Sequence, residues 1–209
     1  MPGSRPSRAD GVLGVVLAGG AGRRLGGAKA NARLGGRALI EWPLAALRGV
    51  LGAEVVVVAK RDTALPPGLT VWIEPDEPRH PATGLAFALE RGQTPHGKGS
   101  DPSPKRVRPV LACAADLPFV PAELLRALLA DESDAPAVVP RAGGRLQPLL
   151  ALYRPAALPV LRAAPADAPL TATVEAMAPA ILDWPDAAAF FNVNDADDLA
   201  RAEARLIRT

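Results

Sequence analysis

A short apolar run, followed at once by a glycine-rich basic loop, constrains this chain more than any other feature of its sequence. The run GVLGVVLAGG is apolar at consecutive positions and does not alternate with polar residues. Continuous apolar character is typical of a strand that is buried on both faces, as in a parallel sheet. The runs EVVVVAK, LTVWIE and PVLACAAD repeat this character further along the chain. Together with helical spacing between the runs, they predict an α/β fold: a three-layer α/β/α sandwich around a mostly parallel, Rossmann-like sheet.

The segments between and after these strands predict the remaining elements. Helices are expected in ALIEWPLAALRGVL, ATGLAFALERG, PAELLRALLAD and ADDLARAEARLIR, and over 155–163 and 170–178. The segment APAVVPRAGGRLQPLLALYRP predicts a hairpin that turns at Gly143 and Gly144, and AFFNVND predicts a short strand. A length of 209 residues suits one domain. We therefore expect a single domain over 11–209, with a disordered leader at 1–10 and a mobile surface insertion at 93–109.

Composition excludes several classes of protein. Hydrophobic residues make up 49% and charged residues 22% of the chain, which are ordinary values for a folded protein and exclude disorder throughout. Its apolar runs are shorter than the roughly 18 residues of a membrane span, and the polar start MPGSRPSRADG lacks a signal peptide's apolar stretch. A single cysteine cannot form an internal disulfide. These observations predict a cytoplasmic protein. A net charge of +2 and 4% aromatic residues argue against a nucleic-acid partner.

The glycine-rich loop LAGGAGRRLGGAK follows the first predicted strand, where open α/β sheets bind their ligands. It fits neither the dinucleotide fingerprint, because Leu25 occupies the third glycine position, nor the Walker loop, because Ala30 follows Lys29. Glycines at 19, 20 and 22 let backbone amides approach an anion closely, and Arg23, Arg24 and Lys29 add positive charge without an acid among them. This composition suits a triphosphate; the alternative is a solvated turn.

An acidic turn follows a later strand, in ACAADLPFV. A lone carboxylate at a strand's carboxyl end, opposite a phosphate-binding loop, is suited to Mg²⁺, which proteins hold with one or two carboxylates plus waters and substrate phosphates. Asp116 is therefore the predicted metal residue, and Mg²⁺ the predicted cofactor. The alternative is that Asp116 only caps the turn before the next helix.

These segments together resemble the molybdenum cofactor guanylyltransferases, a family of the nucleotidyltransferase superfamily with an LAGG-x-x-RR-x-G-x-x-K opening. Here that opening is Leu17 to Lys29, and the similarity continues through LGGRALIEWPLAAL, PATGLAFAL, ADLPFV, QPLLALY and FFNVNDADDL, over about 12–206. The resemblance implies a nucleotidyltransferase fold and a Mg²⁺-dependent transfer of GMP from GTP to the phosphate of molybdopterin, with release of pyrophosphate. It also implies GTP and molybdopterin as substrates and transient contact with proteins that mature molybdoenzymes, without a membrane partner.

The resemblance also assigns roles to residues. It implies that the nucleotide is bound by Leu17, Ala18, Gly19, Gly20, Lys29, Asp76 and Asp116, with Glu74 as the alternate to Asp76. Arg23, Lys29 and Asp116 would be the catalytic residues, because the two cations would stabilise the leaving pyrophosphate and Asp116 would hold Mg²⁺. Contacts to the acceptor substrate are expected from Gln147, Asn192 and Asn194. The neighbouring acids Asp195, Asp197 and Asp198 are expected to cap the closing helix.

Three positions depart from the family pattern. Ala28 stands where the family carries aspartate, Lys60 stands near the place of an asparagine close to guanine, and HPATG replaces a Gly-Pro-Leu sequence. These departures leave a cytidylyltransferase for the same cofactor and a sugar-phosphate nucleotidyltransferase open as alternatives. A non-catalytic protein that binds the nucleotide or the cofactor, and a nucleic-acid-binding module, are the more distant alternatives.

Overall fold

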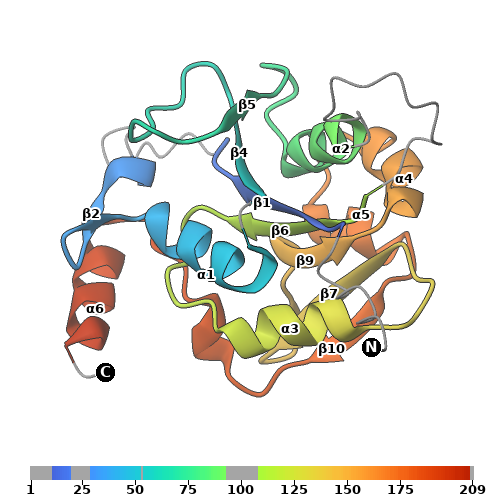
Figure 1. Ribbon diagram of the computed structural model, residues 1–209. Coiled ribbons are helices and arrows are strands. Elements are labelled where there is room, and N and C mark those ends of the chain that lie inside the picture. The colour runs from blue at the N-terminus through green and yellow to red at the C-terminus, as the bar shows by residue number, and fades with distance from the viewer. Residues whose placement is uncertain (1–10, 20–28, 53, 93–107, 208–209) are drawn as a thin grey trace, which may run out of the picture.

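The computed structural model describes residues 11–19, 29–52, 54–92 and 108–207 (Figure 1). Within these residues the main sheet has eight strands in the order β10-β7-β9-β6-β1-β4-β5, with β8 paired to β7. Its strands are β1 (Leu13–Leu17), β4 (Val55–Ala59), β5 (Val71–Ile73), β6 (Val110–Ala114), β7 (Ala137–Ala142), β8 (Arg145–Leu146), β9 (Leu150–Tyr153) and β10 (Ala180–Asp183). The predicted leader 1–10, and all but the last two residues of the predicted insertion 93–109, lie outside the described residues.

Four neighbouring strands end together at one edge of the sheet. β1 lies between β4 and β6 and runs parallel to both, and β5 runs parallel to β4. In this register Leu17 at the end of β1 pairs with Val58 on one side and Ala114 on the other. β9 is antiparallel to β6 and β7, while β10 is parallel to β7. The mostly parallel sheet predicted from the continuous apolar runs is confirmed.

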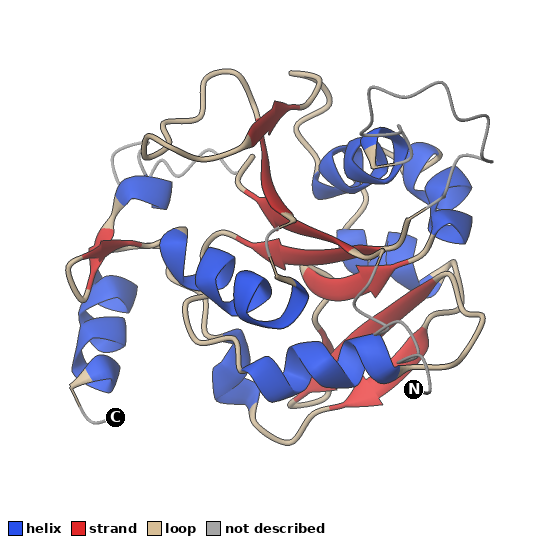
Figure 2. Ribbon diagram, in the orientation of Figure 1, coloured by secondary structure: helices blue, strands red, loops and turns tan. Residues whose placement is uncertain are grey.

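Alternate residues of the strands bury themselves in two separate hydrophobic layers. Val16 and Val57 face one layer, into which α1 (Glu41–Leu51) and α3 (Ala122–Ala130) bury their leucines. Val15 and Val58 face the other, which is covered by α2 (Pro81–Arg91), α4 (Leu158–Arg162) and α5 (Leu170–Glu175). Figures 1 and 2 show the sheet between these two sets of helices. The three-layer α/β/α sandwich is therefore confirmed.

The closing helix α6 (Ala196–Leu206) packs apart from both layers. It lies beside the small hairpin β2 (Arg33–Leu34) and β3 (Arg37–Ala38), on the left of Figure 1. A third apolar cluster joins α6 to this hairpin and includes Leu34, Leu39, Val193, Ala202, Phe119 and Phe191. The Arg205 guanidinium stacks over the Phe119 ring at 4.2 Å from its centroid. The C-terminal segment is thereby anchored next to the loop that follows β6.

Two predictions of secondary structure differ from the structure. The AFFNVND segment is not a strand: a 3-10 turn covers Ala187–Phe190, and Val193 then donates its N–H to the Asp116 carbonyl instead of joining a ladder. Strand β10 was not predicted, because it is a half-exposed edge strand without a continuous apolar run. The predicted hairpin exists, with Gly143 and Gly144 at φ of 55° and 75° between β7 and β8. None of the described helices is both long and apolar enough to span a membrane.

We expect Asp195→Ala to destabilise the protein by about 1 kcal/mol, because the Asp195 carboxylate caps α6 by accepting a hydrogen bond from the Asp198 N–H. Urea-induced unfolding measures this loss. Asp197→Ala is the matched control, since Asp197 is exposed in the first turn of the same helix and keeps only a weaker interaction with the helix dipole. Equal losses in the two variants would contradict the capping role.

Candidate active site

The loops after four adjacent parallel strands converge on one cleft. Leu17 is the last residue of β1, and Gly19 comes just after it. Lys60, Glu74 and Asp116 lie in the segments that follow β4, β5 and β6, respectively. These residues line a cleft of about 170 Å³ together with Arg79, His80, Pro81, Gly84 and Leu149. The parallel register places all four loops at the carboxyl edge of the sheet, which is the usual binding position in open α/β folds. The cleft is therefore the first candidate for the active site.

Lys29 and Asp116, which are 87 positions apart in the chain, meet beside this cleft. The Lys29 ammonium donates to Asp116 Oδ2 at 2.5 Å and to Asn194 Oδ1 at 2.8 Å. Both side chains are 18% exposed, so the pair is partly shielded from water while it remains reachable by a ligand. This contact brings the last residue of the glycine-rich segment and the acidic turn together, as the parallel strands predicted.

Asp116 keeps one oxygen free for a ligand. Its Oδ1 is buried and has no hydrogen-bond partner among the described residues, while Oδ2 accepts from Lys29. A buried carboxylate oxygen without a donor is costly unless a cation or a donor reaches it. No cluster of three or more His, Cys, Asp or Glu side chains occurs in the described part of the chain. Asp116 thus fits an ion that takes its remaining ligands from substrate phosphates and water, which is how Mg²⁺ is usually held.

The segment before α6 completes this site from the other end of the chain. Val193 donates its N–H to the Asp116 carbonyl at 3.0 Å, and Asn194 reaches the Lys29 ammonium. The Asn194 N–H donates to Asp198 Oδ2 at 2.9 Å, and this hydrogen bond holds the pKa of Asp198 below its usual value. Asn194, which we expected to contact the acceptor substrate, thus contacts the Lys29 ammonium.

A buried ion pair lies at the opposite end of the cleft. Lys60 is 2% exposed and Glu74 5%, with Lys60 Nζ 3.5 Å from Glu74 Oε2. The Lys60 ammonium also donates to the carbonyls of Pro75 and Pro78. Burial raises the pKa of Glu74, and the charges of Lys60 and Arg79 oppose that rise. Glu74 Oε2 has no hydrogen-bond partner among the described residues.

Not every predicted nucleotide residue lies in the cleft. Leu17 and Gly19 line it, whereas the Ala18 N–H is used in the sheet, where it donates to the Val58 carbonyl at 2.8 Å. Asp76 is exposed and is not among the residues that line the cleft, whereas its alternate Glu74 is buried there. The sequence signal that favours Glu74 is its place directly after the apolar run VWI. Gly20 and Arg23 lie outside the described residues.

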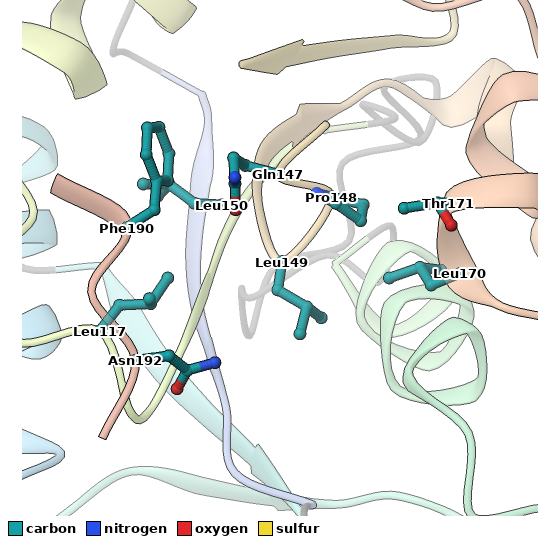
Figure 3. A pocket seen from close by; sticks show the side chains of 9 residues that line it. All are labelled: Leu117, Gln147, Pro148, Leu149, Leu150, Leu170, Thr171, Phe190 and Asn192. Carbon is teal, nitrogen blue, oxygen red and sulfur yellow. The ribbon is translucent and has the colours of Figure 1, made fainter. Parts of the chain in front are cut away.

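A second cleft, of about 180 Å³, adjoins the first. Figure 3 shows Leu117, Phe190 and Asn192 on one side of it, Leu170 and Thr171 on the other, and the segment 147–150 between them. Leu149 lines both clefts, and Leu117 in the second cleft directly follows Asp116 in the first. The Asn192 Oδ1 is buried and has no partner among the described residues. Gln147 and Asn192, two of the expected acceptor residues, thus line the same cleft, whereas Asn194 is not among its lining residues and contacts Lys29.

Three other side chains that could do chemistry are engaged or buried. His80 caps α2, accepting from the Ala82 N–H through Nδ1, while its Nε2 lies 2.8 Å from the Ala168 carbonyl. Arg141 forms two hydrogen bonds with Asp183, at 2.7 and 2.9 Å. Complete burial raises the pKa of the Cys113 thiol far above its usual value, so it is not a nucleophile. The hydrogen bonds of His80 and Arg141 and the burial of Cys113 give the three residues structural roles.

Comparison with known proteins agrees with this geometry. A family model described as the MobA-like NTP transferase domain matches residues 14–191. A molybdenum cofactor guanylyltransferase of Cereibacter sphaeroides is 35% identical over 199 residues, which cover 93% of this chain and 97% of that protein. A protein of the same name from Rhodobacter capsulatus is 32% identical over 197 residues, or 93% of this chain and 96% of that one.

Solved structures show the same fold. The molybdopterin-guanine dinucleotide biosynthesis protein A of Archaeoglobus fulgidus superimposes with a TM-score of 0.70 at 24% identity, covering 95% of this chain and 100% of that chain. A 2-C-methyl-D-erythritol 4-phosphate cytidylyltransferase of Thermus thermophilus superimposes with a TM-score of 0.64 at 24% identity, covering 94% and 99% of the two chains. From the family model, the relatives and the converging strand-end loops, we conclude that this chain belongs to the MobA-like NTP transferase family.

Proposed function

We propose that this protein transfers GMP from GTP to the terminal phosphate of molybdopterin and releases pyrophosphate. The observation that carries the proposal is the contact of Lys29 with Asp116 at the carboxyl edge of the sheet, beside a cleft that ends at Glu74. Relatives that carry the name molybdenum cofactor guanylyltransferase along 93% of this chain support GTP and molybdopterin as the two substrates. The cytoplasm, which the composition predicts, is the proposed compartment.

The two clefts suit two substrates that meet at Asp116. The first would hold the nucleotide between Asp116 and Glu74, and the second would hold the acceptor beside Asn192 and Gln147. The amide oxygen of Asn192, buried without a partner, suits an N–H donor on the pterin. Leu149, which borders both clefts, would lie near the point where the acceptor phosphate approaches the nucleotide. Contact with molybdoenzyme maturation proteins stays a prediction.

The reaction requires no covalent intermediate on the protein. An ionised oxygen of the acceptor phosphate attacks the α-phosphorus of GTP, and the bond from that phosphorus to the bridging oxygen of pyrophosphate breaks. Catalysis then rests on positioning and on neutralising charge. The Lys29 ammonium would contact the phosphates while Asn194 keeps it oriented, and Asp116 would hold Mg²⁺ through its free oxygen. When bound, Mg²⁺ supplies positive charge to the phosphate oxygens.

Pyrophosphate release in the presence of Mg²⁺ and molybdopterin tests the proposed reaction. GTP is expected to support turnover at least about tenfold better than CTP or ATP, because a wrong base that leaves one buried polar group unpaired loses about 1–3 kcal/mol. A preference for CTP would make the protein a cytidylyltransferase for the same cofactor. Faster pyrophosphate release with a sugar phosphate than with molybdopterin would make the protein a sugar-phosphate nucleotidyltransferase. Nucleotide binding without any pyrophosphate release would indicate a non-catalytic protein.

Lys29→Met and Asp116→Asn are each expected to lower kcat by roughly 100- to 1000-fold, or about 3–4 kcal/mol, because each removes a preorganised charge from the transition state. Asp134→Asn is the matched control for Asp116→Asn, since Asp134 is exposed in the loop before β7. Thermal unfolding should show that all three variants fold. Turnover at the wild-type rate in either of the first two variants would refute the proposed roles.

Asn192→Ala is expected to raise the KM for molybdopterin by about tenfold and to leave the affinity for GTP unchanged, because it removes one buried hydrogen-bond acceptor from the second cleft. Steady-state kinetics with each substrate varied in turn separates the two effects. A rise in the KM for GTP, with that for molybdopterin unchanged, would assign Asn192 to the nucleotide instead.

A further inference from the structure

One half-buried leucine borders both clefts of the candidate active site. Leu149 lines the first cleft together with Asp116 and the second together with Asn192, and among the described residues it alone lines both. Its side chain also packs against both hydrophobic layers of the sheet. Figure 3 shows it pointing into the space between Asn192 on one side and Leu170 on the other. Leu149 therefore lies where the proposed nucleotide cleft meets the proposed acceptor cleft.

The backbone at Leu149 is held in place by hydrogen bonds from three strands. Its carbonyl accepts from the Ala114 N–H, in the last residue of β6, at 2.8 Å. The preceding carbonyl, of Pro148, accepts from the hydroxyl of the buried Tyr153 in β9 at 2.6 Å. The N–H two positions before Leu149 donates to the Pro140 carbonyl of β7 at 2.9 Å. The position of Leu149 is thus fixed relative to the end of β6, after which the acidic turn begins.

The side chains around Leu149 at this junction are apolar. Leu117, which directly follows Asp116, is 5% exposed and lines the second cleft, as does Leu170. An ordered water in a protein needs about two to four polar partners. The side chains of Leu117, Leu149 and Leu170 offer it none. The junction therefore disfavours an ordered water, although the charged pair of Lys29 and Asp116 lies beside the first cleft.

Water competes with the acceptor phosphate in a reaction of the proposed kind. When water attacks, its oxygen bonds to the α-phosphorus of GTP, and the bond from that phosphorus to the bridging oxygen breaks. The bonding electron pair leaves with pyrophosphate, one proton of the water passes to the solvent, and GMP is formed. The positive charge that Lys29 supplies to the transfer would serve this hydrolysis equally. A site that uses this charge must therefore keep water away from the α-phosphorus.

We propose that Leu149 determines which nucleophile reaches the nucleotide: its side chain fills the place from which water would attack and admits the acceptor phosphate. This proposal rests on the proposed function, because it assumes that GTP lies in the first cleft and the acceptor in the second. The acceptor is held by contacts of its own, such as the one proposed for Asn192, so it needs no hydrogen bond at the junction. A water molecule has no such anchor. Leu149 is thus a specificity-determining residue that suppresses the hydrolysis of GTP.

Hydrolysis without an acceptor tests this role directly. The full chain is incubated with GTP and Mg²⁺ alone, and the formation of GMP is followed. Leu149→Ala is expected to raise the rate of GMP formation roughly tenfold, because a water that fills the vacated space gains hydrogen bonds to the phosphates. Leu149→Asn, which places an amide in a similar volume, should raise this rate at least as much. In water labelled with heavy oxygen, the label should enter GMP and not pyrophosphate, as attack at the α-phosphorus requires.

A second readout is the ratio of GMP to transferred product when molybdopterin is present. The wild type should form mainly the transferred product. Leu149→Ala should shift the ratio toward GMP by roughly tenfold or more. Leu149→Met keeps an apolar side chain of similar volume and should hold the ratio within about twofold of the wild-type value. A purely structural role of Leu149 would lower both products and leave their ratio unchanged.

Leu158→Ala is the matched control. Leu158 begins α4, is half-buried against one of the two hydrophobic layers that Leu149 contacts, and lines neither cleft. The two substitutions remove the same atoms from half-buried leucines, so both should lower the melting temperature. Only Leu149→Ala should raise the rate of GMP formation. An equal rise in the two variants would show that loosened packing, and not the position of Leu149, admits water, and would overturn the proposal.

The outcomes separate this proposal from the proposed function. If Leu149→Ala forms GMP at the wild-type rate without an acceptor, or loses GMP and transferred product in proportion, water exclusion by Leu149 is refuted, even where Lys29 and Asp116 prove essential. If the substitution raises only the KM for molybdopterin, Leu149 contacts the acceptor and the proposal is likewise refuted. If the wild type forms neither product, the proposed function itself fails. Should Leu149→Ala not fold, Leu149→Val in the same two assays decides the question.

Discussion

The ion pair between Lys29 and Asp116 is the interaction on which the proposed chemistry depends. It joins the exit of the glycine-rich loop to the end of β6, across 87 residues of sequence, and leaves one buried oxygen of Asp116 free. A lysine and an aspartate held in contact by the fold are already in place before a substrate arrives. Electrostatic stabilisation of this kind is effective because the charged groups are oriented during folding and do not have to reorganise during the reaction.

The parallel strands explain how two substrates can be brought to this pair. Because β1, β4, β5 and β6 share one direction, their following loops form a continuous rim, and one nucleotide can extend along it from Asp116 to Glu74. The antiparallel strand β9 arrives at β6 from the opposite direction, so the residues before it, Gln147 to Leu149, border the second cleft. The change of direction at the β6–β9 boundary therefore separates the two clefts, while Leu149 borders both.

Much of this arrangement was predictable from the sequence, for identifiable reasons. The buried strands have continuous apolar runs, and parallel strands bring the residues after them to one edge, so the meeting of Lys29 with Asp116 could be expected. Strand β10 lies at the edge of the sheet and alternates between half-buried and exposed residues, so it has no continuous apolar run from which it could be predicted. Asp76 was favoured over Glu74 because local sequence does not show which of two nearby acids is buried; that depends on the carbonyls and the lysine that surround Glu74 in the folded chain.

The hydrogen bonds between the segment before α6 and the Lys29–Asp116 pair have a consequence for how the site depends on distant parts of the chain. Val193 and Asn194 bind Asp116 and Lys29 directly, and the helix after them anchors that segment against the β2–β3 hairpin. Without this stretch the chain would keep every strand of the main sheet, together with Lys29 and Asp116, but would lose the contacts that Val193 and Asn194 make with them. The geometry of the Lys29–Asp116 pair therefore depends on a segment more than 75 positions further along the chain than Asp116, so a proteolytic cut before Val193 would loosen the pair without cutting through the sheet.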